Sequence, residues 1–284
     1  MKIINKILDG KAVSQQIKAE ITEIVSKLSS PPKLSVILVG NNFASSVYVK
    51  NKSQACIVCG IQSEVITLDE NISEAELLKK IHELNQDNHT HGILVQLPLP
   101  KQIREDRIIE NIDPRKDVDG FHPLNVGHLF LKKAMLEPCT PVGVIEILKR
   151  YALPIAGKHV VIIGRSNIVG KPLGIMFLRE NATVTYCHSK TRDLPSVAQT
   201  ADILIAAIGK AQFVTDEFVK TNAVIIDVGI NRLPNGKLAG DVDFEKVSPK
   251  VSAITPVPGG VGPMTIAILL KNTLKAYQNI MHKK

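Results

Sequence analysis

Short apolar runs alternate with helix-forming segments twice along this chain, and this alternation constrains the fold more than any other feature. The apolar runs have the length of buried strands, and the segments between them carry apolar residues at helical spacing. In order, the elements predicted for the first half are helix 13–28, strand 34–39, helix 42–59, strand 61–68, helix 73–88 and strand 92–95. Strands separated by helices predict a parallel sheet with helices on its faces.

The second half repeats the alternation after an interruption. Residues 97–141 contain six prolines and several charged turns, which predicts a domain junction near residues 120–140. Beyond it come a predicted strand at 159–164, a helix from Gly170, strands at 182–187, 203–208 and 223–228, a glycine- and proline-rich loop at 256–263, and a final amphipathic helix. With 284 residues, the chain is long enough for about two domains. The sequence therefore predicts an α/β fold with two α/β domains, the second of them Rossmann-like.

Charge and composition narrow the class of protein. The chain carries 35 lysines and arginines against 27 acidic residues, a net charge of +8, which favours anionic partners. No apolar run approaches the roughly 20 residues that span a bilayer, and residues 1–6 lack the apolar core of a signal peptide. Four cysteines are too few for a disulfide scaffold. We therefore expect a cytoplasmic, soluble protein.

A glycine turn after the strand at 159–164 is the first candidate binding site. Gly164-Arg165-Ser166 follows the apolar run, and a helix is predicted to start at Gly170. Glycine permits a tight turn, and a helix N-terminus offers free N–H groups to phosphate. Because Ser166 stands where a dinucleotide-binding motif has its second glycine, the motif alone is also compatible with an ordinary turn between a strand and a helix.

The next predicted strand favours a cofactor, and NADP over NAD. An NAD site places an acidic residue about 20 residues after the first glycine, where it binds the ribose 2′-hydroxyl. Here that region contains no acid, and Arg165, Ser189 and Lys190 are available as donors to a 2′-phosphate.

A lysine interrupts an apolar helix face in the first half. This face of the predicted helix 42–59 carries Tyr48, Lys52, Ala55 and Cys59, flanked by Val47 and Val58. Lys52 either extends its amine to the edge of the face or is desolvated, which favours the neutral amine needed for proton transfer. Gln96 and the acid-rich loop at 116–120 favour the second interpretation, because ligands bind at the carboxyl ends of strands in open α/β sheets.

Taken together, these motifs resemble the bifunctional methylenetetrahydrofolate dehydrogenase/methenyltetrahydrofolate cyclohydrolase family. The matching segments are 48–52, 92–100, 116–121, 138–141, 164–170, 228–231 and 255–265. They occur in order over essentially the whole chain. The most specific is Pro258-Gly259-Gly260-Val261-Gly262-Pro263-Met264-Thr265.

The resemblance implies two reactions. In the first, 5,10-methylenetetrahydrofolate gives a hydride to NADP; in the second, water opens the 5,10-methenyl cation to 10-formyltetrahydrofolate. It implies Lys52 as the general acid/base of hydrolysis, with Gln96 as its hydrogen-bonding partner. Asp119 would bind the pterin ring, Tyr48 would line the substrate site, and both would take part in catalysis.

The resemblance also implies further binding residues and a domain arrangement. The remaining substrate-binding residues would be Val95, Leu97, Pro258, Gly259 and Gly260. The cofactor-binding residues would be Gly164, Arg165, Ser166, Ser189 and Ile230. Residues 1–139 with the C-terminal helix 264–284 would form the tetrahydrofolate-binding catalytic domain, and 140–263 the NADP-binding domain, with a cleft between them. A homodimer is implied, for which the apolar strand 223–228 or its neighbours are candidate interfaces.

Two alternatives remain. The non-enzymatic alternative is a nucleic-acid-binding protein. Against it, the lysines of this chain are scattered along the sequence, without an arginine-rich stripe or interleaved aromatic residues. We therefore expect neither a nucleic-acid nor a membrane partner. An NADP dehydrogenase without cyclohydrolase activity is the enzymatic alternative, and replacement of Lys52 separates it from the bifunctional enzyme.

The remaining cysteines and histidines predict no metal site. Cys56 and Cys59 form a lone C-x-x-C motif without a second Cys/His pair, which favours helix packing over zinc binding. His188 is expected either at the cofactor site or at a surface strand end. The other histidines considered, His82, His89 and His91, are expected at solvated helix and turn positions.

Overall fold

The structure, a computed structural model, describes residues 6–281 and forms two compact units. One unit comprises Gln15–Cys139 with Ile266–Lys284 and contains a three-stranded sheet. The other comprises Met1–Ser14 with Thr140–Thr265 and contains a six-stranded sheet. We call them the three-stranded unit and the six-stranded unit, each limited to its described residues.

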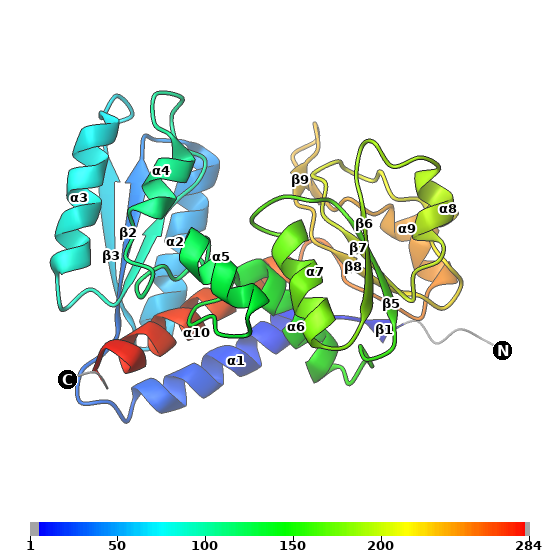
Figure 1. Ribbon diagram of the computed structural model, residues 1–284, viewed down its shortest axis with the longest axis horizontal. Coiled ribbons are helices and arrows are strands. Elements are labelled where there is room, and N and C mark those ends of the chain that lie inside the picture. Colours follow the sequence, from blue (N-terminus) through cyan, green and yellow to red (C-terminus); the bar gives the residue numbers. More distant parts are fainter. Residues whose placement is uncertain (1–5, 282–284) are drawn as a thin grey trace. The chain divides into compact units, whose positions relative to one another are not determined.

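The three-stranded unit is built on the parallel sheet predicted for the first half. Its strands are β2 (Lys33–Val39), β3 (Gln62–Leu68) and β4 (Gly92–Val95), in the order β3-β2-β4. Side chains alternate between the two faces of a strand. Ile37 and Val39 of β2 accordingly pack in a cluster with Leu77 and Ile81 of α3 (Glu74–Gln86). The other face of the sheet packs against α2 (Phe43–Val58), and Figure 1 shows both helices beside the strands.

The helix ends of this unit follow from local capping. Asn42 caps α2 through Ser45 N–H, and Ser73 with Glu76 forms the predicted capping box of α3. Helix α1 (Gly10–Val25) begins in the six-stranded unit and continues into this one. Between residues 97 and 141, where only a punctuated junction is predicted, the structure forms α4 (Glu105–Glu110) and α5 (Pro123–Phe130).

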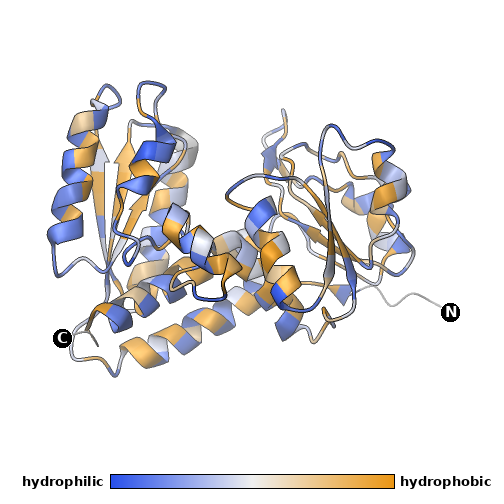
Figure 2. Ribbon diagram, in the orientation of Figure 1, coloured by the Kyte–Doolittle hydropathy of each residue, from blue (hydrophilic) through white to orange (hydrophobic). Residues whose placement is uncertain are grey.

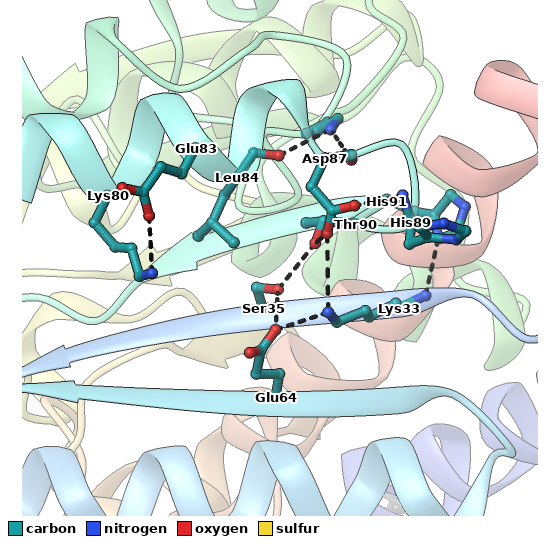
Figure 3. A network of polar contacts seen from close by, with 11 residues as sticks. Lys33, Ser35, Glu64, Lys80, Glu83, Leu84, Asp87, His89, Thr90 and His91 are labelled. Atoms are coloured by element: carbon teal, nitrogen blue, oxygen red, sulfur yellow. Dashed lines mark hydrogen bonds and ion pairs between the residues drawn. The ribbon is translucent and has the colours of Figure 1, made fainter.

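A polar network lies at the amino ends of these strands (Figure 3). Lys33 forms an ion pair with Glu64, whose carboxylate also accepts from the hydroxyl of Ser35. His91 is buried, its Nδ1 accepts from the Lys33 N–H, and its ring meets Tyr277 edge-on. The prediction of a solvated His91 is therefore wrong, because β4 begins one residue later and carries it inward. His82 and His89 are exposed as predicted.

The six-stranded unit has a doubly wound strand order, 2-1-3-4-5 when counted from β5 (His159–Ile163), with β1 (Lys6–Ile7) added at the edge. Its strands are β1, β11 (Ala253–Ile254), β8 (Val224–Asp227), β7 (Ile203–Ala206), β5 and β6 (Thr183–Cys187), in that order across the sheet. All the pairs are parallel. Alternate residues such as Val161, Leu204 and Ile225 form its apolar core. Figure 2 shows the apolar character of these central strands.

Shorter elements surround this sheet. The helices are α6 (Cys139–Arg150), α7 (Gly170–Arg179), α8 (Leu194–Ala198) and α9 (Phe244–Val247), with 3-10 turns at Asp216–Phe218 and Ser248–Lys250. A small antiparallel hairpin joins β9 (Asn231–Arg232) to β10 (Leu238–Ala239). Strand β8 is buried between β7 and β11. Both edges of strand 223–228 are therefore occupied within the chain and cannot pair with a second copy, whereas an interface formed by its neighbours stays a prediction.

The chain ends depart from the predicted domain boundaries. Lys6 and Ile7 pair with Ala253 and Ile254, so residues 6–14 belong to the six-stranded unit although they were predicted with the first domain. The last helix, α10 (Val261–Met281), starts three residues before the predicted 264, and its residues from Ile266 belong to the three-stranded unit. Residues 1–5 and 282–284, which include the segment tested for a signal peptide, lie outside the described residues.

Candidate active site

Lys52 and Gln96 meet at the carboxyl end of the three-stranded sheet. Lys52 lies on α2, and Gln96 directly follows β4. The Lys52 Nζ donates a hydrogen bond of 3.1 Å to Gln96 Oε1. The Gln96 side chain is fixed in turn, because its Nε2 donates to Leu97 O at 2.7 Å and its backbone N–H donates to Ile37 O. The half-buried amine of Lys52 is therefore held in one direction by an amide that cannot take its proton.

Asp119 is carried to the same end of the sheet by its neighbours. The segment before it runs parallel to β4, since Asp117 bridges Ile93 and the Ile93 N–H donates to Lys116 O at 2.8 Å. Asp119 follows in the turn that is closed by the Gly120 N–H donating to Asp117 O at 3.1 Å. Burial raises the pKa of Asp119, the negative charge of Asp117 raises it too, and the positive charge of Lys52 lowers it. The carboxyl group thus lies within electrostatic reach of the lysine.

The other residues predicted for substrate binding lie in two places. Tyr48 lies one helical turn before Lys52 and is 44% exposed. Val95 is the buried last residue of β4, and Leu97 follows Gln96. Pro258, Gly259 and Gly260 instead belong to the six-stranded unit, where they line a cavity of about 120 Å³ together with residues 227–230.

The predicted cofactor residues line a separate cavity of about 330 Å³ in the six-stranded unit. Gly164, Arg165, Ser166 and Ser189 all contribute to its wall, as does His188. Gly164 has a φ of +130°, and a Cβ there would lie 2.2 Å from Ala207 O, so only glycine fits the turn. The Ser166 hydroxyl accepts from the Val169 and Gly170 N–H groups, which explains a serine in place of the second glycine.

These residues suit a phosphorylated dinucleotide. Arg165 and Lys210 supply positive charge to the cavity, and its wall contains no acidic side chain. The backbone of the turn at 188–191 is fixed by bonds between His188 N–H and Thr191 Oγ1 and between Lys190 N–H and His188 Nδ1. Ile230 is the exception among the predicted residues, because it lines the smaller cavity with the 256–263 loop.

Several residues that organise these sites were missed by the sequence analysis. Cys139 is buried, and its Sγ donates to Val118 O at 3.2 Å, next to Asp119. Lys116 is buried with its Nζ donating to the carbonyls of Leu84, Asn85 and Asp87 at the end of α3. Both residues lie in segments that resemble the family, Cys139 in 138–141 and Lys116 in 116–121. Their partners are backbone carbonyls, which no spacing of residues in the sequence reveals. Cys56 and Cys59 are buried free thiols, which agrees with packing.

Metal-binding clusters and membrane-spanning helices are both absent from the described part of the chain. Within residues 6–281, no group of three or more histidine, cysteine, aspartate and glutamate side chains could hold a metal ion. Over the same residues, no helix is both long and apolar enough to cross a membrane.

An open parallel sheet with a glycine turn at the carboxyl end of β5 is typical of nucleotide-binding folds. The Lys52–Gln96 pair in the other unit adds a site suited to proton transfer. Comparison with known proteins identifies the family. Residues 8–119 match the family model "Tetrahydrofolate dehydrogenase/cyclohydrolase, catalytic domain", and residues 138–281 match that of the family's NAD(P)-binding domain. The chain belongs to the tetrahydrofolate dehydrogenase/cyclohydrolase family and is a bifunctional enzyme of one-carbon metabolism.

Individual relatives match over nearly their whole length. The bifunctional protein FolD of Streptococcus uberis is 54% identical, with 99% of each chain covered. The crystal structure of FolD from Campylobacter jejuni has a TM-score of 0.93 at 53% identity and covers 97% of this chain and 99% of its own. The structure of the Trypanosoma brucei enzyme is described as complexed with NADP cofactor and inhibitor. It has a TM-score of 0.91 at 36% identity, and the match covers 96% of this chain and 97% of that one.

Proposed function

We propose that this enzyme oxidises 5,10-methylenetetrahydrofolate with NADP and hydrolyses the resulting 5,10-methenyl cation to 10-formyltetrahydrofolate, with Lys52 as the acid/base of hydrolysis. The observation that carries the proposal is the hydrogen bond of 3.1 Å from Lys52 Nζ to Gln96 Oε1. In this assignment, the three-stranded unit binds the folate and the six-stranded unit binds the dinucleotide. The Streptococcus uberis relative named as bifunctional supports the pair of activities.

Hydride transfer requires orientation rather than a protein base. NADP, when bound, accepts a hydride from the methylene carbon, and the folate nitrogen lone pair stabilises the cation that remains. The chain's contribution is to hold the two reactants in line. Gly164, Arg165, Ser166 and Ser189 would hold the nucleotide, with Arg165 and Lys190 as donors to the 2′-phosphate. Ile230 would contact the nucleotide and Pro258–Gly260 the folate, and all of them line the smaller cavity of the six-stranded unit.

Hydrolysis requires a group that takes and returns a proton. As water adds to the methenyl carbon, the neutral amine of Lys52 accepts one of its protons. When the bond from that carbon to folate N5 breaks, the same amine returns a proton to N5, and the second proton of the water is released to solvent. Gln96 directs the amine by accepting its hydrogen bond.

Substrate binding falls to the residues around this pair. The pKa of Asp119 is raised by burial, and its carboxyl group can bind the N–H groups of the pterin ring. The exposed ring of Tyr48 offers a surface for the pterin and aminobenzoate groups. Val95 and Leu97 flank Gln96 and provide apolar contact.

The test is an absorbance assay of both steps. Formation of the methenyl product from 5,10-methylenetetrahydrofolate is followed with NADP and with NAD, and decay of added methenyltetrahydrofolate is followed separately. Lys52→Met is compared with Lys50→Met, an exposed lysine on the same helix. We expect Lys52→Met to abolish decay while hydride transfer falls much less, and Lys50→Met to behave as wild type.

Two results contradict the proposal in different ways. Absence of methenyl formation with either nucleotide rules out the dehydrogenase reaction. Decay of methenyltetrahydrofolate by Lys52→Met at the wild-type rate leaves the enzyme in place but removes Lys52 from the hydrolytic step.

We also propose that the enzyme is a cytoplasmic homodimer. The four cysteines are all buried free thiols, which suits a reducing compartment. Light scattering coupled to size-exclusion chromatography should give twice the 31.0 kDa mass of the chain. A mass of one chain at micromolar concentration contradicts the dimer.

A further inference from the structure

Asp241 forms an internal anion site beside the proposed cofactor cavity. Its carboxylate is fully buried and accepts backbone N–H bonds from three consecutive residues, Ile208, Gly209 and Lys210, at 2.6, 2.9 and 2.8 Å. Asn231 Nδ2 donates a fourth bond of 3.0 Å. Consecutive backbone N–H groups that converge in this way form a concave site for an anion. Here the chain fills that site with its own carboxylate.

The segment held by Asp241 is a wall of the cavity. It follows β7, at the carboxyl edge of the sheet where ligands bind in this fold. Ile208 and Lys210 line the same 330 Å³ cavity as Arg165 and Ser189. The N–H groups of 208–210 are already paired, so they serve to fix the shape of the wall rather than to bind phosphate.

A second buried carboxylate connects Asp241 to the smaller cavity. Asp227 accepts from the N–H groups of Gly229 and Asp241 at Oδ1 and from that of Val242 at Oδ2, each at 2.9 Å. A Cβ on Gly240 would lie 1.8 Å from Asp227 Oδ2, so the backbone approaches this carboxylate as closely as it can. Asp227 and Gly229 both line the cavity of the 256–263 loop. The two carboxylates therefore fix segments that wall both cavities.

We propose that Asp241 is a positioning residue for nucleotide binding, which holds the 208–210 backbone in the shape that accepts NADP. The inference rests on the cofactor cavity assigned under the proposed function. It concerns affinity for the nucleotide rather than the chemistry of either step, because Asp241 is buried behind the wall and contacts the cavity only through that backbone.

Asp241→Asn tests this role with little change in shape. The amide keeps one acceptor oxygen but turns an N–H donor toward the N–H groups that the lost oxygen had paired. We expect the KM for NADP to rise by about tenfold or more, with kcat at saturating NADP much less affected. The cyclohydrolase rate, measured without nucleotide, should stay at the wild-type value, whereas a general folding defect would lower it.

Two further variants complete the experiment. Asp243→Asn is the matched control, because Asp243 caps α9 through the Lys246 N–H and does not contact 208–210; its KM for NADP should be unchanged. Should Asp241→Asn fail to fold, Asn231→Ala leaves the three backbone bonds of Asp241 in place. It removes the fourth bond to Asp241 and the longer bond of 3.4 Å to Ala239 O, and it should raise the KM for NADP to a smaller extent.

The results separate this inference from the proposed function. A wild-type KM for NADP in Asp241→Asn, or in Asn231→Ala if only that variant folds, overturns the positioning role. Parallel loss of both activities in a folded Asp241→Asn protein also overturns it. If wild type shows no NADP-dependent oxidation, the proposed function fails, and equilibrium dialysis with NADP still tests Asp241.

Discussion

Asp227 has a raised pKa, although its carboxyl group accepts hydrogen bonds from three backbone N–H groups. It is only 3% exposed. Burial raises the pKa of Asp227 to about 7, and the neighbouring charge of Asp241 raises it too, against the lowering effect of the three N–H donors. Asp241 is the charged side chain whose field raises the pKa of Asp227. The groups that donate hydrogen bonds to the Asp227 carboxylate are backbone N–H groups. At pH 7 the Asp227 carboxyl group is therefore about half protonated in the folded protein, whereas it is fully ionised in the unfolded chain.

This proton makes stability depend on pH in a definite direction. The unfolded carboxyl ionises at its ordinary pKa of 3.8, so between there and pH 7 the folded state binds more protons. The contribution of Asp227 to the free energy of unfolding therefore falls as pH rises toward 7 and levels off above it, with about 1.4 kcal/mol lost between pH 6 and 8. Urea unfolding of Asp227→Asn should lack this part of the slope, whereas Asp243→Asn should keep it. Equal slopes in wild type and Asp227→Asn contradict the prediction.

Single residues differ in how far the sequence reveals them. Lys52 interrupts an apolar stripe, and Gln96 follows a predicted strand, so their positions mark them before any contact is known. Neither Asp227, within a predicted strand, nor Asp241 is marked by any motif, because most of their partners are backbone groups set by the tertiary fold. His91 likewise has the sequence of a turn position, because its buried partners, Lys33 N–H and the Tyr277 ring, lie far away along the chain.

At the scale of elements, α10 supports the site through one amide. Asn272 lies on this helix, and its Nδ2 donates to Val118 O at 2.8 Å and to Glu137 O at 2.9 Å. Val118 directly precedes Asp119, so the helix helps to fix the segment that carries the proposed pterin-binding carboxyl group.

Asn272→Ala should therefore lower both stability and folate affinity. Loss of the amide leaves Glu137 O without that donor and weakens the pairing of Val118 O, at a cost of about 2 kcal/mol in the free energy of unfolding. We also expect a higher KM for 5,10-methylenetetrahydrofolate. Asn279→Ala is the matched control on the same helix, since Asn279 Nδ2 has no hydrogen-bond partner among the described residues. A control as destabilised as Asn272→Ala would show that the helix, not the amide, is responsible.

Elements were predictable where their pattern is long. Strand 92–95 and the start of α7 at Gly170 are as predicted, and the other long strands agree within two residues at either end. The two-residue strands β1 and β11 are too short to show any alternation. Helices α4 and α5 were missed because six and eight residues leave little room for helical periodicity and prolines surround them.

At the scale of the whole molecule, the two-unit α/β architecture follows from the repeated alternation, but the assignment of the chain ends does not. Residues 6–14 join the six-stranded unit through β1, which pairs with a strand about 250 residues later in the sequence. No local pattern encodes a partner so distant. Net charge, by contrast, is readable from the sequence alone, and it carries a functional consequence.

The net charge of +8 should make nucleotide binding depend on salt. Positive potential raises the local concentration of anions, and salt screens it over about 10 Å at 0.1 M ionic strength. NADP carries a 2′-phosphate that NAD lacks, and exposed Arg165 lines the proposed cavity. Raising the salt from 0.02 to about 0.5 M, which shortens the screening length several-fold, should therefore increase the KM for NADP more than the KM for NAD. Arg165→Gln should reduce the difference between the two slopes. Equal salt slopes for both nucleotides in wild type would mean that neither Arg165 nor the surrounding charge distinguishes the 2′-phosphate.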